Sequence, residues 1–299
     1  MNPNWGTREW FESMFDSSKH PTTDGWKTAF RGSQKFRHDL YIKVLKRLLS
    51  KGKKIQVLDI GCALGDLTGK VWKLNQINEI YGIDISKNAM IRASRKYPEF
   101  EFIVGSLPIL PFRGNSFDLI LCLEVLYYLP FKKRIRSLEN IRKTLKPESY
   151  LLFSGVLDGG IRYFAEDQIL GLISRFFQIE TIVYNYAKIY TEIERPLLHL
   201  LSICNGIERY SNMMHTEDFE KLHRESAGEP KVESERIFMK ILNCLLFGQI
   251  IARIIGKFVS KIVISIFSSK VLVGLSYGLT KFLLGRKGKT HIIILAKKT

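Results

Sequence analysis

Short apolar runs alternate with longer, more polar stretches through most of the chain. The runs are typical of buried strands and occupy residues 55–60, 80–83, 100–104, 117–123, 150–156, 177–183 and 290–296. Helices are expected between them, including one over residues 132–144, stopped by Pro147, and one over residues 161–176. Right-handed crossovers suit this alternation, which predicts an α/β fold with a doubly wound, mostly parallel sheet.

The first strand runs into a glycine turn. Residues 57–66 read Val-Leu-Asp-Ile-Gly-Cys-Ala-Leu-Gly-Asp, and a helix should follow from about Leu67. Asp84 ends the second strand, 25 residues after Asp59. Glycines let the backbone approach a ligand, and an acid at the tip of the next strand can hold two ribose hydroxyls. The combination predicts a nucleotide-cofactor site.

The acids around the turn indicate which cofactor it suits. A dinucleotide site would read G-x-G-x-x-G and leave a helix N-terminus free for a pyrophosphate. Here the pattern is D-x-G-x-A-x-G, with Asp59 before the turn and Asp66 just after it, which suits an ammonium or sulfonium group. The chain therefore resembles the class I S-adenosylmethionine-dependent methyltransferases. The resemblance continues through residues 110–112, 116–120 and 124–130, and covers residues 35–185 and the last ten.

This resemblance implies a Rossmann-like sheet of seven strands whose last strand is antiparallel, with S-adenosyl-L-methionine as the cofactor. It implies that Gly61, Ala63 and Gly65 bring the backbone close to the cofactor, and Ala63 stands where the family has a glycine. Asp59 would orient the turn and the ammonium group of the cofactor. Asp84 would bind the ribose.

Five further residues are implied to contact the cofactor. Ile85 and Leu107 would sandwich the adenine, with simple core packing as the alternative. Ser106 stands where the family often has an acid, and its hydroxyl could accept from the adenine amino group. Trp26 and Arg31 would close over the cofactor, and Arg31 would pair with its carboxylate. A solvated surface position is the alternative for Arg31.

The acceptor is expected beside the fourth strand. Glu124, Tyr127 and Tyr128 follow that strand, and they could bind an amine or a hydroxyl, with Glu124 as the proton acceptor. Methyl transfer depends mainly on positioning, and it requires a base only if the nucleophile must lose a proton. Packing is the alternative for the tyrosines. Residues 124–129, 10–11 and 24–26 are also similar to nodulation-type N-methyltransferases that act on amino sugars.

The positive charge is concentrated at the end of the chain. The net charge is +17, and residues 236–299 hold 12 of the 46 Lys and Arg residues but no Asp or Glu. The longest uncharged run there, Ile241–Ala252, is 12 residues, whereas a membrane-spanning helix needs about 20 apolar residues. On an unbroken helix, Arg253, Lys257 and Lys261 would lie opposite an aliphatic face. That pattern favours an anionic membrane interface over nucleic acid, with a helix packed on the domain as the alternative.

The chain is expected to fold in four parts. They are a helical cap (1–50), a cofactor-binding core (51–183), a helical, basic and apolar insertion serving as lid or membrane platform (184–289) and a closing strand (290–299). The insertion should emerge at the carboxyl ends of the strands, where open α/β sheets bind ligands.

Composition narrows the function further. The four cysteines are widely spaced, so neither a metal site nor a disulfide is expected, and the N-terminus has no secretory core, which favours a cytoplasmic address. We expect a methyltransferase acting on N or O of a small or lipid-linked acceptor, such as a sugar, with peripheral attachment to the inner face of a membrane. The alternatives are an RNA methyltransferase that uses the basic tail and a non-catalytic cofactor-binding scaffold. The oligomeric state and the acceptor atom stay open.

Overall fold

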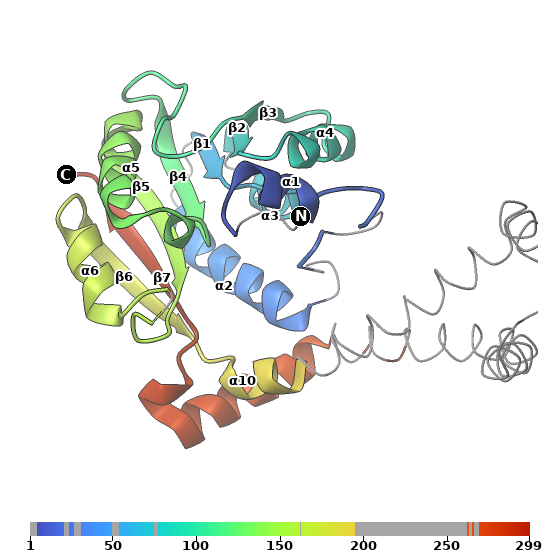
Figure 1. Cartoon of the computed structure of the whole chain (residues 1–299). Coiled ribbons are helices and arrows are strands. Elements are labelled where there is room, and N and C mark those ends of the chain that lie inside the picture. The colour runs from blue at the N-terminus through green and yellow to red at the C-terminus, as the bar shows by residue number, and fades with distance from the viewer. Residues whose placement is uncertain are drawn as a thin grey trace, which may run out of the picture.

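The structure is a computed structural model that describes residues 5–20, 24–26, 31–49, 54–74, 77–161, 163–194, 262, 265 and 269–299. Its centre is a seven-stranded sheet in the order β3-β2-β1-β4-β5-β7-β6 (Figure 1). All neighbours are parallel except β7, which runs antiparallel to β5 and β6. The predicted doubly wound sheet with an antiparallel last strand is therefore confirmed. The strands are β1 Ile55–Ile60, β2 Ile77–Asp84, β3 Glu101–Val104, β4 Phe117–Leu123, β5 Leu145–Val156, β6 Gln178–Asn185 and β7 His291–Lys297.

Helices cover both faces of the sheet (Figure 1). One face packs against α2 and α3, and the other packs against α5 and α6. Side chains of the central strand β4 alternate between the two layers, with Leu119 and Leu121 on the α2 side and Ile120 and Cys122 on the α5 side. The α-helices are α1 Arg8–Met14, α2 Gly32–Leu48, α3 Asp66–Trp72, α4 Lys87–Lys96, α5 Phe131–Thr144, α6 Glu166–Ser174 and α10 Lys270–Leu284. Because β4 is buried on both faces, its sequence is apolar except for Asp118 near its start.

Some element boundaries differ from the sequence expectation. The helix expected from residue 161 begins only at Glu166, because Phe164 forms a bridge with Leu157, the residue after β5, and the Phe164 ring is buried in the core. The fifth strand begins at Leu145 rather than at Tyr150, because Leu145 already pairs with Phe117. An apolar pattern cannot predict this added part of β5, because it contains polar residues.

The first residues of the expected insertion (184–194) and its last part lie among the described residues. Its helix α10 packs beside α2, where the Tyr277 ring lies 5.2 Å from the Phe36 ring (Figure 1). The Tyr277 hydroxyl also donates to the Tyr184 carbonyl at 3.1 Å, so α10 is anchored at the carboxyl end of β6. Residues 195–261, including Arg253, Lys257 and Lys261, lie outside the described residues. The division into four parts stays a prediction.

No helix within the described ranges combines the length and the apolar character needed to cross a membrane.

Candidate cofactor and acceptor site

The glycine turn after β1 folds back across the end of β2. The amide of Gly61 donates to the Ile83 carbonyl at 2.7 Å, and φ is +72° at Gly61, +52° at Ala63 and +76° at Gly65. A left-handed backbone is unfavourable for residues with a Cβ atom. At Gly61 a Cβ atom would also lie 2.2 Å from Cγ2 of Val125. Gly61 is thus required by both conformation and space, whereas Ala63 holds a conformation that glycine adopts more easily.

Asp84 lies at the tip of β2, beside this turn. Its Oδ2 accepts from the amide of Ala63 at 3.1 Å, and its Oδ1 accepts from the amide of Ser86 at 3.0 Å. Burial raises the pKa of Asp84 to about 6, although the backbone amides oppose the shift. Each carboxylate oxygen retains acceptor capacity, so the residue fits the two hydroxyls of a ribose. The ribose contact itself stays a prediction.

Asp59 is directed into the protein. It accepts from the Thr68 hydroxyl at 2.7 Å and so joins β1 to α3. Burial raises its pKa to about 7, the Thr68 hydrogen bond opposes this, and the nearby Asp84 adds to it. The hydrogen bond from Thr68 to Asp59 thus links the two elements on either side of the glycine turn. A contact between Asp59 and the ammonium group of the cofactor stays a prediction. The second acid of the motif, Asp66, forms an exposed ion pair with Lys96.

The residues expected around the adenine come together at the ends of β2 and β3. Asp84 pairs with Val104 across these strands, and the Asp84 carbonyl accepts from the Gly105 amide at 2.9 Å. The half-buried Ile85 thus neighbours Ser106, which is half-buried, and Leu107, which is buried. Their contacts with adenine stay predictions.

The N-terminal helix is attached to the same place. The Glu12 carboxylate of α1 accepts from the Ser86 hydroxyl at 2.7 Å and from the amides of Lys87 and Asn88 at 2.7 and 2.9 Å. Ser86 is the N-cap of α4, and Lys87 and Asn88 are its first two residues, so Glu12 caps the helix that follows Asp84. No sequence signal pointed to Glu12, because its partners are more than 70 residues away.

Trp26 lies in an aromatic cluster on this cap. Its ring is 5.5 Å from those of Trp10 and Phe15, and Phe11 lies 5.0 Å from Tyr128. The cluster therefore joins the N-terminal segment to the loop after β4. Trp26 therefore lies near the site, and its contact with the cofactor stays a prediction.

Arg31 has a partner within the protein. Its Nε and Nη2 donate to Oε2 of Glu194 at 3.0 and 2.9 Å, and Ser33 donates to the same buried carboxylate. Glu194 follows β6, so this contact connects the start of α2 to the beginning of the insertion. The pairing of Arg31 with a cofactor carboxylate stays a prediction.

Glu124 lies at the centre of a polar cluster at the end of β4. Its backbone is left-handed, with φ +63°, and its carboxylate accepts from the Ser154 hydroxyl, from Tyr41 at 3.3 Å and from Tyr127 at 3.4 Å. Burial acts to raise the pKa of Glu124, but the charge of Arg37 and the other polar neighbours lower it overall. The carboxylate is therefore ionised at neutral pH.

Arg37 and His291 complete this cluster, and sequence reasoning missed both. The Arg37 guanidinium donates to Nε2 of His291, which lies 3.6 Å from Glu124 Oε2. Burial, with the charge of Arg37, lowers the pKa of His291 to about 3, so the ring is neutral. Its Nδ1 lies 3.0 Å from the Thr290 hydroxyl. Because Arg37 and His291 are 254 positions apart, no local pattern could reveal the contact.

Tyr127 and Tyr128 lie in a short 3-10 helix, Leu126–Tyr128, and their rings contact each other with centroids 4.6 Å apart and planes tilted by 44°. Burial raises the pKa of Tyr127 well above its usual range and that of Tyr128 to about 12. Both hydroxyls are therefore protonated at neutral pH and can donate hydrogen bonds. Tyr127 is directed to Glu124, while Tyr128 packs against the cap. No group of three residues that could hold a metal occurs in the described parts of the chain.

The family described as "Methyltransferase domain" matches residues 58–153, which run from within β1 to within β5 and include the glycine turn and Glu124. The chain carries an S-adenosylmethionine-dependent methyltransferase domain. The predicted resemblance to this class is thereby confirmed, and S-adenosylmethionine is the cofactor of the domain.

Individual relatives match part of the chain. An uncharacterized protein of Methanocaldococcus jannaschii is 32% identical over 120 residues, which are 39% of this chain and 49% of that protein. Nodulation protein S of Sinorhizobium fredii is 28% identical over 143 residues, 46% of this chain and 63% of that protein. The chain thus spans 49% and 63% of the lengths of these two relatives. The crystal structure of the N-methyltransferase NodS from Bradyrhizobium japonicum, in complex with S-adenosyl-L-homocysteine, covers 58% of this chain and 90% of its own, at 23% identity and TM-score 0.48.

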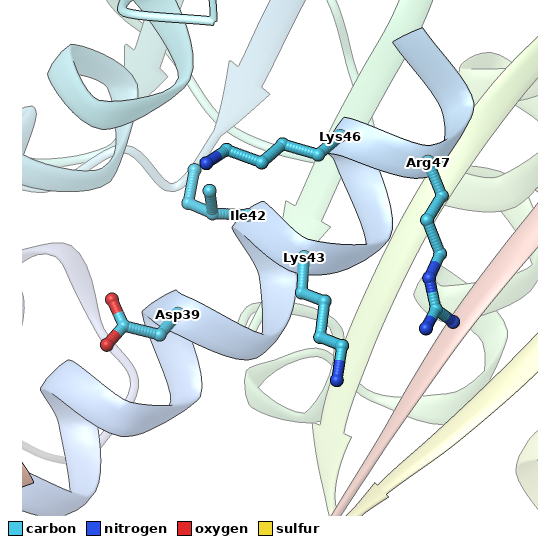
Figure 2. Close-up of a pocket in the computed structure, with 5 residues that line it drawn as sticks. All are labelled: Asp39, Ile42, Lys43, Lys46 and Arg47. Atoms are coloured by element: carbon cyan, nitrogen blue, oxygen red, sulfur yellow. The ribbon is translucent and has the colours of Figure 1, made fainter. Parts of the chain in front are cut away.

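A separate hollow lies on the outer face of α2. Among the described residues it is lined by Asp39, Ile42, Lys43, Lys46 and Arg47, and its volume is about 390 Å³ (Figure 2). Tyr41, which contacts Glu124, belongs to the inward face of the same helix. The hollow therefore contains none of the predicted site residues.

Proposed function

We propose that this protein transfers a methyl group from S-adenosylmethionine to a nitrogen or oxygen atom of a small or lipid-linked acceptor at a membrane surface. The observation that carries the proposal is that the predicted cofactor-binding residues lie next to the predicted acceptor-binding residues. The turn at Gly61 belongs to the cofactor set, and it abuts Val125, the residue after Glu124. β1 and β4 are neighbours, so methyl donor and acceptor would meet between them.

When bound, the cofactor would supply an electrophilic methyl group on a sulfonium, whose sulfur would keep the electrons of the carbon–sulfur bond as the acceptor lone pair bonds to carbon. The protein's own contribution is positional. Asp84 and the glycine turn would hold the nucleoside, while Glu124 and the Tyr127 hydroxyl would orient the acceptor. An acceptor N–H or O–H would donate to the ionised Glu124, which can take the proton or pass it to water.

The apolar face of α10 supports a membrane surface. The exposed fractions of Val271, Leu275 and Phe282 are 73%, 72% and 86%. The inward face of the helix instead carries Ser276 and Thr280, whose hydroxyls donate to carbonyls of α10 itself. Val273 and Tyr277 pack inward as well, so α10 has an inward packed face and, in addition, an outward face of large apolar side chains, which is unusual for an ordinary surface helix.

Charge identifies the kind of surface. Lys281, Arg286 and Lys287 are exposed at the C-terminal end of α10, and the chain contains no acid from residue 236 onward. Cations beside an outward apolar face favour an anionic lipid bilayer, where both features are used together. We therefore assign this face to a membrane of anionic lipid.

The acceptor class can be tested with methyl-labelled S-adenosylmethionine, supplied with lipid extract, soluble glycans or total RNA. We expect label in the lipid or glycan fraction. Label in RNA alone would replace the proposal by the RNA methyltransferase alternative. Cofactor binding without label in any fraction would favour the non-catalytic scaffold.

Flotation with liposomes tests the membrane contact. We expect the protein to float with anionic liposomes, and Leu275→Ser with Phe282→Ser to reduce flotation at every salt concentration. Lys281→Gln with Lys287→Gln should remove only a part that is sensitive to salt. Ile161→Ser is the matched control, because Ile161 is 90% exposed outside α10. Salt-sensitive retention of RNA without flotation would contradict the assignment.

A further inference from the structure

Two buried side chains at the carboxyl edge of the sheet have polar atoms without partners. Asn185 is 1% exposed, yet neither Nδ2 nor Oδ1 has a hydrogen-bond partner within the described structure. Arg37 is 9% exposed, and its Nε is also unpaired there. Buried polar groups are nearly always paired, because an unsatisfied donor or acceptor loses its hydration without compensation. These atoms therefore indicate a polar ligand.

The unpaired atoms belong to the acceptor side of the site. Asn185 ends β6 and stands opposite His291 of β7. Residues opposite each other on antiparallel strands project to the same face, so Asn185 lies beside the ring that accepts from Arg37. The same ring is 3.6 Å from the carboxylate of Glu124. Asn185, Arg37 and Glu124 thus form one contiguous polar group.

The charges in this group balance. Arg37 is positive, Glu124 is negative, and the His291 ring between them is neutral. The next charged pair, Arg31 with Glu194, is also balanced. A phosphate would require an excess of positive charge, and an ammonium group would require an excess of negative charge. The ligand that fits is uncharged.

The hydrogen-bonding capacity narrows the ligand further. The Asn185 amide offers two donors and one acceptor, Arg37 Nε offers one donor, and Glu124 offers acceptors. A hydroxyl group both donates and accepts hydrogen bonds, so two or more neighbouring hydroxyls can pair with all of these donors and acceptors. We propose that Asn185, Arg37 and Glu124 bind the hydroxyl groups of an uncharged carbohydrate unit in the methyl acceptor. This inference rests on the proposed function, since it names the substrate class of the same site.

Ligand-observed nuclear magnetic resonance can test the inference independently of turnover. The protein, saturated with S-adenosyl-L-homocysteine, is mixed with glucose, N-acetylglucosamine, glucosamine or inorganic phosphate. We expect the two uncharged sugars to bind, and Asn185→Leu to weaken that binding about tenfold or more. The affinity for S-adenosyl-L-homocysteine should stay within twofold. The control is Gln178→Leu, which replaces an exposed amide at the other end of β6.

If Asn185→Leu does not fold, Asn185→Ser and Arg37→Lys provide the same comparison. Binding of phosphate alone, or of neither uncharged sugar, would overturn the inference. Unchanged sugar binding in folded variants, with a raised melting temperature, would also overturn it, because the amide would then be merely an unsatisfied group. Sugar binding with no methyl transfer to any acceptor would contradict the proposed function instead. Methyl transfer to an acceptor without a carbohydrate would leave that function standing and refute the carbohydrate site.

Discussion

Removal of the Glu12 charge should loosen the cap over the cofactor. The carboxylate accepts three hydrogen bonds of 2.7 to 2.9 Å from the N-cap and the first two residues of α4, directly after Asp84 and Ile85. In Glu12→Gln one oxygen becomes an amide donor, so at least one of the three bonds is lost. The favourable charge at the helix N-terminus is lost as well.

The size of the effect follows from these contacts. A hydrogen bond to a charged group contributes about 1.5–3 kcal/mol, and a charge at a helix N-terminus about 0.3–1 kcal/mol. Glu12 is half-buried, so solvent reduces both contributions, and we expect a total of about 1–2 kcal/mol. If the cap must close to retain the cofactor, affinity should fall about 5- to 30-fold.

Calorimetry with S-adenosyl-L-homocysteine measures the affinity, and stopped-flow dilution measures the dissociation rate. We expect the loss to appear mainly as faster dissociation, because the cap covers a site that is otherwise complete. Glu9→Gln is the matched control, since it removes the same charge from an exposed position of α1. Equal affinities for wild type, Glu12→Gln and Glu9→Gln would refute the link between the cap and the cofactor.

Three other predictions concern the site itself. Asp84→Ala should weaken S-adenosylmethionine binding at least about tenfold in calorimetry. Because the pKa of Asp84 is about 6 and its ionised form is the better hydrogen-bond acceptor, the affinity of the wild type should rise with pH through that value and then level off. Asp84→Asn should make this pH profile flat. A flat wild-type profile would count against the ribose role. Tyr127→Phe and Tyr128→Phe should each slow turnover more than they weaken cofactor binding, and the opposite ratio would place them on the cofactor side. Ala63→Gly should raise the free energy of unfolding, measured in urea, by about 1 kcal/mol, because a left-handed backbone costs a residue with a Cβ atom roughly 1–2 kcal/mol. An unchanged or lower free energy of unfolding would show that the backbone at Ala63 is not strained.

The apolar pattern predicted those parts of the fold whose residues are buried on both sides. β1 and β4 begin and end where the sequence indicates, because most of their residues, 57–60 in β1 and 119–123 in β4, are buried. The pattern failed at the start of β5, where Lys146 is half-buried and Pro147 and Glu148 are exposed. It also failed before α6, since an aromatic residue such as Phe164 suits a bridge as well as a helix.

The same contrast applies to the site. The glycine turn and Asp84 were predictable because a local spacing along the chain defines them. Glu12, Arg37, Asn185 and His291 were not, because each acquires its role from a residue brought near by the sheet or by the cap. Glu124 was expected beside the acceptor, but only the structure brings the buried Arg37, which lowers its pKa, alongside it.

A structure of the protein with bound S-adenosyl-L-homocysteine would test the central claim most directly. The claim predicts both ribose hydroxyls within hydrogen-bond distance of the Asp84 carboxylate and the sulfur atom facing the segment from Glu124 to Tyr128. A ribose bound away from Asp84, or a sulfur atom turned away from that segment, would contradict it.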